Sequence, residues 1–216
     1  MLGSRLTIFA LAWLSFGCLL GQFYGLWTMR WFGCWVLPPA TVLLVLTAYL
    51  HRGGARGLGS PWTWIARGAL GGVVAAVAYD LYRLPFVLSG APLFNVFPRF
   101  GELLLGGAEP RWLVQGLGWT YHFSNGASLG IMFLVMASCF RRPRLVWGAV
   151  GWALLVETTL LLTPYASFFG LTLDARFLFL TASAHLVFGV ALGWFCRWTL
   201  GPLAGFDRPV SSALAR

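Results

Sequence analysis

Apolar residues fill six long stretches of this chain, separated by short polar or glycine-rich segments. A helix needs about 20 predominantly apolar residues to cross a bilayer, and each stretch approaches or exceeds that length. The pattern predicts membrane-spanning helices near residues 6–27, 31–50, 65–88, 112–138, 145–164 and 177–197. Pro38 and Pro39 lie inside the second stretch, where we expect a kink that neighbouring helices can tolerate. The sequence therefore predicts an all-α, polytopic membrane helix bundle that occupies residues 1–216 as a single domain.

The composition supports this prediction and limits the partners. Hydrophobic residues make up 59% of the 216 residues and charged residues 10%, whereas a soluble domain carries about 25% charged residues. The net charge of +9 would suggest nucleic acid as the partner of a soluble protein. Here the arginines between the apolar stretches are better explained as residues that fix orientation. We therefore expect a lipid bilayer, and no nucleic acid, as partner.

The arginines also predict how the chain crosses the membrane. Most of them precede the first stretch, follow the sixth, or separate the second from the third and the fourth from the fifth: Arg5, Arg52, Arg56, Arg67, Arg141, Arg142, Arg144, Arg197, Arg208 and Arg216. Basic residues accumulate on the cytoplasmic side, so both termini are predicted to be cytoplasmic. The chain has no lysine, which we interpret as the coding bias of a GC-rich bacterium and hence a bacterial inner membrane. The first stretch continues to Trp27, longer than a signal-peptide core, so we expect an uncleaved first helix.

The longest predicted outer loop, residues 89–110, is unusually apolar. It contains three phenylalanines and three consecutive leucines beside Arg99 and Glu102. A loop surrounded by water rarely exposes so much apolar surface. We therefore expect this segment to lie in the outer membrane interface or to dip inward, as an anchor of the fold or as a lid over a site that opens outward.

An acidic residue or a histidine interrupts each of the last four stretches: Asp80, His122, Glu157 and His185. Ionisable groups inside a span are rare and indicate function. At a rise of about 1.5 Å per residue, all four lie in one layer, at or just outside the midplane of the bilayer. The third histidine, His51, falls in a predicted loop and is interpreted as solvated.

The last four stretches contain a pattern that occurs twice. The fourth and the sixth both read His-x3-Gly-x3-Gly, at residues 122–130 and 185–193. Each follows a stretch with one acid and a downstream proline, in the same direction through the membrane. This predicts a parallel internal repeat about a pseudo-twofold axis. Residues four apart share a helix face, so each histidine is expected to face the bundle interior beside glycines that permit close packing.

Two imidazoles and two carboxylates at one depth are a complete ligand set for a divalent ion such as zinc, manganese or iron. We predict that Asp80, His122, Glu157 and His185 bind such an ion in the outer half of the bilayer. The metal would offset the cost of burying two acids, and an acid left free beside it would act as a general base. The protein would then be a metal-dependent membrane enzyme that acts on a lipid or another apolar small molecule.

Other polar residues near these four are predicted to support the site or to bind substrate. Arg83, one turn from Asp80, is a candidate for holding an anionic head group, as is Arg99 in the outer loop. The full set of supporting residues is Tyr79, Arg83, Gln115, Tyr121, Asn125, Thr158, Thr159 and Thr181.

Three other interpretations stay open. His122 and His185 suit the axial positions of haem b, with the glycines making room for the flat ring, although two carboxylates in that layer fit haem poorly. A chain of aspartate, histidine and glutamate also fits a small proton- or ion-coupled transporter, which with six spans would favour a homodimer. In a purely structural interpretation, Asp80–Arg83 and Glu157–histidine pairs hold the helices together.

Overall fold

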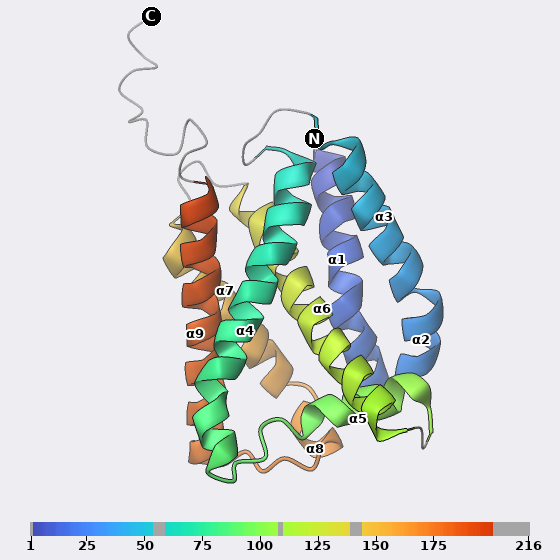
Figure 1. Ribbon diagram of the computed structural model, residues 1–216, viewed down its shortest axis with the longest axis vertical. Helices are drawn as coiled ribbons and strands as arrows, with labels where there is room; N and C mark the ends of the chain where they lie inside the picture. The colour runs from blue at the N-terminus through green and yellow to red at the C-terminus, as the bar shows by residue number, and fades with distance from the viewer. Residues whose placement is uncertain (1, 54–58, 108–109, 139–143, 201–216) are drawn as a thin grey trace, which may run out of the picture.

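The computed structural model describes residues 2–53, 59–107, 110–138 and 144–200 (Figure 1). Within these ranges every regular element is helical, as the sequence predicts. The elements are α1 (Leu2–Phe23), α2 (Met29–Trp35), α3 (Leu37–Leu50), the π-helical turn η1 (Thr63–Arg67), α4 (Gly68–Leu88), α5 (Val96–Leu105), α6 (Arg111–Ala137), α7 (Leu145–Leu161), α8 (Tyr165–Phe168) and α9 (Ala175–Leu200). Each predicted apolar stretch therefore coincides with a helix or with a pair of helices.

Several of these helices can cross a membrane by length and composition. Among the described residues, four segments qualify: Gly3–Phe23, Met29–Leu50, Thr63–Leu88 and Ala175–Leu200. The α7 helix is apolar but has only 17 residues. The α6 helix has 27 residues but lower hydropathy, because Gln115, His122 and Asn125 interrupt it. The two further predicted spans, at 112–138 and 145–164, thus form helices, and their crossing of the membrane stays a prediction.

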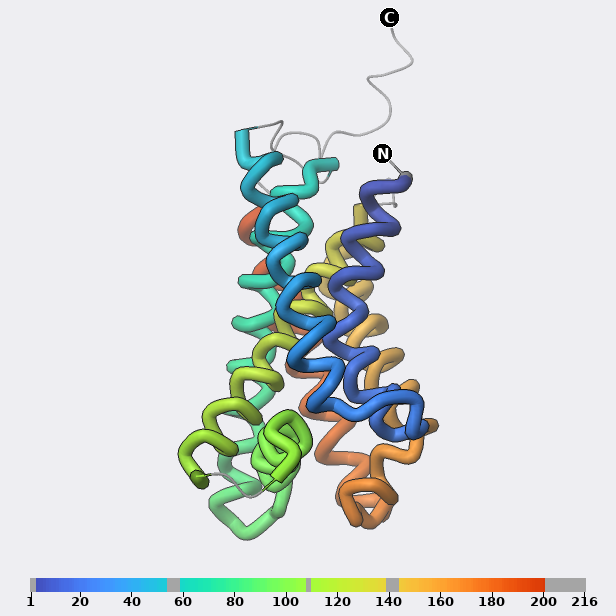
Figure 2. Tube along the Cα trace, turned by 90° about the vertical axis from the view of Figure 1, so that its right-hand side faces the viewer, coloured from blue at the N-terminus to red at the C-terminus, as the bar shows by residue number. Residues whose placement is uncertain are grey.

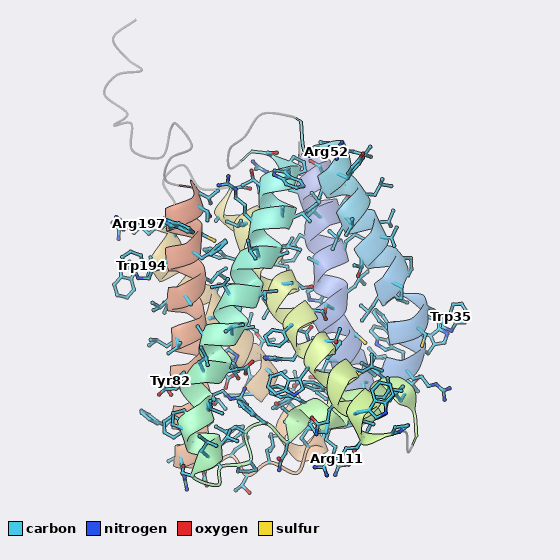
Figure 3. All side chains as sticks on the ribbon, in the orientation of Figure 1. Trp35, Arg52, Tyr82, Arg111, Trp194 and Arg197 are labelled. Atoms are coloured by element: carbon cyan, nitrogen blue, oxygen red, sulfur yellow. The ribbon has the colours of Figure 1, made fainter. Side chains whose placement is uncertain are left out.

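Large apolar side chains cover the outside of these helices. Trp35 and Trp194 are 72% and 59% exposed and project away from the bundle (Figure 3). Leu50 and Leu88, at the ends of α3 and α4, are exposed as well. A soluble protein rarely exposes an apolar surface of this extent, so the surface is typical of a protein surrounded by lipid.

The helices pack side by side in an order that differs from their order in the chain (Figures 1 and 2). The α7 helix packs on α9, α9 on α4, α4 on α6, and α6 on α1, which α3 flanks. The described part of α1 begins at the end of the bundle where α9 ends, while α5 and α8 lie at the opposite end (Figure 1). This order places α4, α6, α7 and α9, the helices with the predicted site residues, next to one another.

Glycines bring α4 and α6 into backbone contact. A Cβ atom built on Gly72 would lie 2.0 Å from the carbonyl oxygen of Gly126, and one built on Gly130 would lie 2.1 Å from that of Gly68. Real Cβ atoms do not approach other heavy atoms so closely, so only glycine fits these positions without moving a helix. Gly126 and Gly130 are the two glycines of the first His-x3-Gly-x3-Gly pattern.

The second copy of the pattern packs in the same way. A Cβ atom on Gly189 of α9 would lie 2.5 Å from the Cα of Val150, and one on Gly193 would lie 2.4 Å from the Cα of Val146. Both partners belong to α7. Each glycine-bearing helix therefore packs on the acid-bearing helix that precedes it, which confirms the predicted role of these glycines in close packing.

The structure adds detail to two predicted segments. The second stretch divides into α2 and α3 at Val36, and Pro38 and Pro39 fall in the first turn of α3, where a missing N–H leaves no hydrogen bond unmade. The loop 89–110, whose residues 108–109 lie outside the described ranges, contains α5. Phe97 and Phe100 of α5 are buried, and α5 packs across α6.

The glycine contacts predict a difference between two substitutions on α6. Gly130→Ala places a methyl group against the backbone of α4 and is expected to lower stability by about 1–3 kcal/mol. Gly116→Ala meets open space and is expected to be neutral or to stabilise by up to about 1 kcal/mol through helix propensity. Thermal unfolding in detergent, followed by circular dichroism, measures both. Equal effects of the two substitutions would contradict the packing described above.

Candidate functional site

Asp80 of α4 and His122 of α6 form one buried pair. The His122 Nε2 lies 2.8 Å from the Asp80 Oδ2, and Asp80 as a whole is only 8% exposed. Gly72 lies on the same face of α4 as Asp80, two turns before it, and Gly126 lies on the same face of α6 as His122, one turn after it. These two glycines let the helices approach closely. An ionised carboxylate only accepts hydrogen bonds, so in this pair Nε2 donates and Nδ1 is left as the free ring nitrogen.

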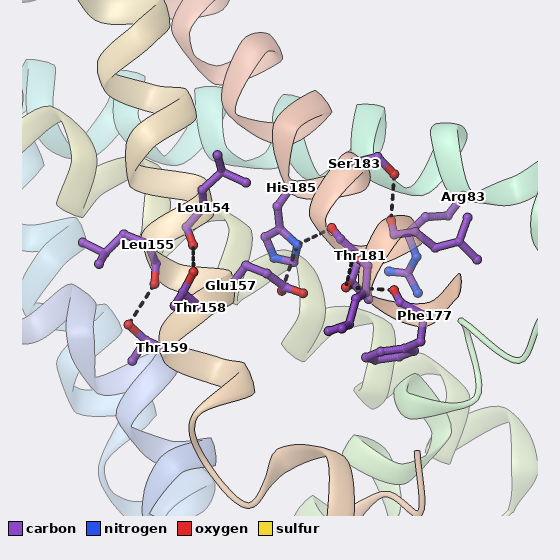
Figure 4. Close-up of polar contacts among 12 residues, drawn as sticks. Arg83, Leu154, Leu155, Glu157, Thr158, Thr159, Phe177, Thr181, Ser183 and His185 are labelled. Atoms are coloured by element: carbon purple, nitrogen blue, oxygen red, sulfur yellow. Dashed lines mark hydrogen bonds and ion pairs between the residues drawn. The ribbon is translucent and has the colours of Figure 1, made fainter. Parts of the chain in front are cut away.

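Glu157 of α7 and His185 of α9 form the second buried pair (Figure 4). The His185 Nδ1 lies 3.0 Å from the Glu157 Oε2 and 2.9 Å from the backbone oxygen of Thr181. A carbonyl oxygen cannot donate, so Nδ1 carries the hydrogen and Nε2 is the free ring nitrogen. In both pairs the carboxylate thus fixes the tautomer of the histidine and leaves its other nitrogen available.

Tyr79 and Arg83 join the two pairs. The ring centroid of Tyr79 lies 6.2 Å from that of His122 and 5.0 Å from that of His185. The Arg83 guanidinium lies over the Tyr79 ring, 4.6 Å from its centroid, and its Nη1 lies 3.7 Å from the Asp80 Oδ1. Arg83 is buried and also donates a hydrogen bond to the backbone oxygen of Leu93. The predicted Asp80–Arg83 pairing is therefore present, although the distance is longer than a hydrogen bond.

The charges of this cluster balance only when it holds an extra proton. Arg83 contributes one positive charge, and Asp80 and Glu157 contribute two negative charges. With both histidines neutral the cluster carries a net charge of −1, and one proton on a histidine makes it neutral. A net charge in an apolar bundle is costly. Asp80 has Arg83 beside it, whereas the ion partner of Glu157 within the described ranges is His185.

A cavity of about 440 Å³ lies beside the cluster. Both histidines, Tyr79 and Arg83 line it. Among the described residues the two carboxylates are not part of its lining; they lie behind their histidines. Tyr165 of α8 also lines the cavity, and burial raises the pKa of its hydroxyl well above the usual value, so this group stays a neutral hydrogen-bond donor.

The other predicted supporting residues divide into two groups. Asn125 and Thr181 line the cavity, and the Asn125 Oδ1 accepts a hydrogen bond of 2.8 Å from the Ser15 hydroxyl. Four residues have other surroundings. Tyr121 is buried and donates a hydrogen bond to the backbone oxygen of Ser15. Gln115 lines a separate hollow near α5. The hydroxyls of Thr158 and Thr159 donate hydrogen bonds to backbone oxygens of their own helix, those of Leu154 and Leu155 (Figure 4).

The residues around the site that the sequence did not predict include Phe97 and Trp152. Phe97 of α5 packs on His122 with ring centroids 4.4 Å apart. Trp152 of α7 lines the cavity, and its indole N–H donates to the Leu129 backbone oxygen. The apolar character of the loop 89–110 indicated contact with the bundle and would have been the signal for Phe97. Trp152 is one of twelve tryptophans, and nothing in its neighbourhood distinguishes it from the others.

The four predicted metal ligands lie in two separate acid–histidine pairs. Within the described ranges, no three histidine, cysteine or acidic side chains are grouped closely enough to hold a metal ion. Each acid is instead placed on its own histidine. One oxygen of each carboxylate, the Asp80 Oδ1 and the Glu157 Oε1, is buried without a hydrogen-bond partner in the part of the chain that the structure describes. Binding of one ion by all four residues stays a prediction.

Comparison of the chain with protein-family models, with curated proteins and with solved structures gives no match. The function of the protein is therefore inferred from the geometry of the site.

Removal of Asp80 is expected to destabilise the protein strongly, because Arg83 would remain buried without a carboxylate. Breaking such a pair costs about 3–5 kcal/mol. The double substitution Asp80→Ala, Arg83→Met removes both charges and is expected to recover most of that loss. Glu102→Ala is the matched control, because Arg99 and Glu102 form an ion pair of the same spacing whose side chains are 67% and 45% exposed, worth at most about 1 kcal/mol. Thermal unfolding in detergent ranks the three variants, and a double variant less stable than Asp80→Ala would contradict this assignment.

Proposed function

We propose that this is an integral membrane protein that binds an apolar, lipid-like small molecule in the cavity and acts on it through its two paired histidines. The observation that carries the proposal is that both histidines line one cavity while each is held from behind by a carboxylate. A carboxylate that orients a histidine is the arrangement by which enzymes prepare an imidazole for proton transfer. Mostly apolar walls with a few convergent polar groups are typical of a small-molecule site.

The two histidines have different roles in this proposal. His122 is neutral, with Nδ1 free, and accepts a proton from the bound molecule. His185 carries the balancing proton of the cluster and delivers a proton to another atom of the same molecule from Nε2. The two transfers together leave the total charge of the cluster unchanged, so the completed reaction places no net charge in the apolar bundle. Two titratable groups whose surroundings differ are a common basis for such a division into base and acid.

A second form of the proposal keeps the predicted metal ion. The buried oxygens of Asp80 and Glu157 that lack hydrogen-bond partners favour it, because a cation would satisfy both. The free nitrogens of His122 and His185 are the other donors, and zinc, manganese and iron suit such a set. The protein would then be a metal-dependent membrane enzyme with the same apolar substrate class.

The placement in the membrane is part of the proposal. Arg52 and Arg197 lie at one end of the bundle and Arg111 at the other (Figure 3). Placing the first end in the cytoplasm of a bacterium follows the positive-inside rule. Five arginines used in that prediction lie outside the described ranges: Arg56, Arg141, Arg142, Arg208 and Arg216. The internal repeat and the homodimer also stay predictions; the like packing of α4 with α6 and of α7 with α9 supports the repeat.

Metal analysis and an absorption spectrum of the detergent-purified protein separate the forms of the proposal. We expect well under one metal ion per chain and no visible band. One metal per chain, lost in the double variant His122→Ala, His185→Ala but kept in the control His51→Ala, would establish the metal form instead. A haem Soret band lost in the same double variant would overturn both forms in favour of haem b.

Acid–base catalysis predicts that a variant without the base retains its substrate. The protein His122→Asn, purified in mild detergent and extracted with organic solvent, is expected to release an apolar molecule at a level at least tenfold above wild type. Mass spectrometry identifies the molecule, and wild-type protein is expected to convert it in the same detergent. His51→Asn is the control, because His51 is exposed and does not line the cavity. Equal extracts from His122→Asn and His51→Asn would contradict the proposal, and ion flux in vesicles abolished by His122→Asn would favour the transporter.

A further inference from the structure

The cavity continues past the histidines into a chamber without charged groups. The residues that line this part are Phe16, Ala76, Leu129, Trp152, Ala153 and Phe188. Leu129 follows His122 by seven residues on α6 and Phe188 follows His185 by three on α9, so the chamber extends about 5–10 Å beyond the histidines along the bundle. The indole N–H of Trp152 is already bonded to the Leu129 backbone, so this tryptophan presents an apolar surface.

The chamber is closed at its far end. One helical turn beyond its lining, Ala149 of α7 and Leu192 of α9 are completely buried, as is Leu134 of α6. These residues belong to the main hydrophobic core of the bundle. Because protein interiors are packed at the density of organic crystals, a molecule cannot extend through this layer without displacing it.

The opposite part of the cavity reaches the end of the bundle with α5 and α8, where its lining includes both apolar and charged residues. Its lining includes residues 90–93, between α4 and α5, and residues 170–172, before α9. Asp174 and Arg176, both exposed, line it as well. Along the bundle the cavity thus changes from charged and open, through the histidine cluster, to apolar and closed.

We propose that the ligand is a single-chain amphiphile that enters with a short apolar end first. Its apolar end fills the closed chamber, its reacting polar group lies at His122 and His185, and its hydrophilic remainder lies between Asp174 and Arg176. The volume of about 440 Å³ is in the lower part of the roughly 300–1,000 Å³ range of small-molecule sites, so it fits one chain better than two. The closed end sets the greatest length of the apolar end. This inference rests on the proposed function and names its substrate class.

The experiment is a competition among saturated fatty acids, from hexanoate to palmitate, offered as an equimolar mixture to the full-length protein. Native mass spectrometry of the protein, released from detergent, identifies the chain lengths of the fatty acids that remain bound. For wild type we expect a preference for short chains with a sharp upper limit. Ala153→Leu fills part of the chamber and is expected to shift that limit to shorter chains, with about fourfold less binding for each methylene that no longer fits.

Two further variants make the result decisive. Phe188→Leu removes volume from the closed end and is expected to shift the limit to longer chains, so the inference does not depend on one substitution that fills space. Leu155→Phe is the control, because Leu155 lies on the same helix as Ala153 but is 57% exposed on the outside of the bundle. It is expected to leave the distribution unchanged.

The outcomes distinguish this inference from the proposed function. Fatty acids that bind with the same chain-length distribution in all four proteins would overturn the tail-first orientation and leave the proposed site standing. Absence of any bound fatty acid from wild type, or equal binding by the wild type and by the double variant His122→Ala, His185→Ala, would overturn the proposed site together with the inference.

Discussion

Backbone contact within two pairs of helices determines where the side chains of the candidate site lie. Gly72 and Gly126 bring α4 to α6, and Gly189 brings α9 to α7. Side chains as short as Asp80 can reach a histidine on another helix only when the helix axes are this close. With larger residues at the contact, the axes would separate toward the usual 8–10 Å, and the carboxylates would lose the histidines that compensate their burial. The polar cluster and the close packing therefore depend on each other.

Much of the fold follows from the sequence because its two strongest signals are local. The apolar stretches predict the helices, and the spacing in 122–130 and 185–193 predicts which face of α6 and α9 packs closely. Counting residues along each helix also predicts that Asp80, His122, Glu157 and His185 share one layer, and the structure pairs each acid with one histidine. The depth of a residue depends only on its position along its own helix, so one apolar stretch is enough to predict it.

The remaining features depend on which helices are neighbours, which no single stretch contains. The sequence predicts four donors in one layer, which we interpret as a single ligand set. It carries no information on the distances between side chains that lie on different helices within that layer. The structure places Tyr79 in contact with both imidazoles and each carboxylate on its own histidine. The contribution of Phe97 depends on α5 folding across α6. The break at Val36 depends on where the prolines fall within a helix turn, which hydropathy does not report.

The polarity of α6 has a consequence for how the protein reaches its folded state. Insertion machinery accepts a helix into lipid according to the apolarity of that helix, and residues such as Gln115, His122 and Asn125 oppose insertion. In the folded protein α1, α4 and α5 cover α6, and all three precede it in the chain. The partners of α6 are thus synthesised before it, so its polar face can be received by protein rather than by lipid. If α6 spans the membrane as predicted, the order of synthesis matters to this site as much as its side chains do. A circular permutant with α6 first would then have to expose its histidine to the bilayer.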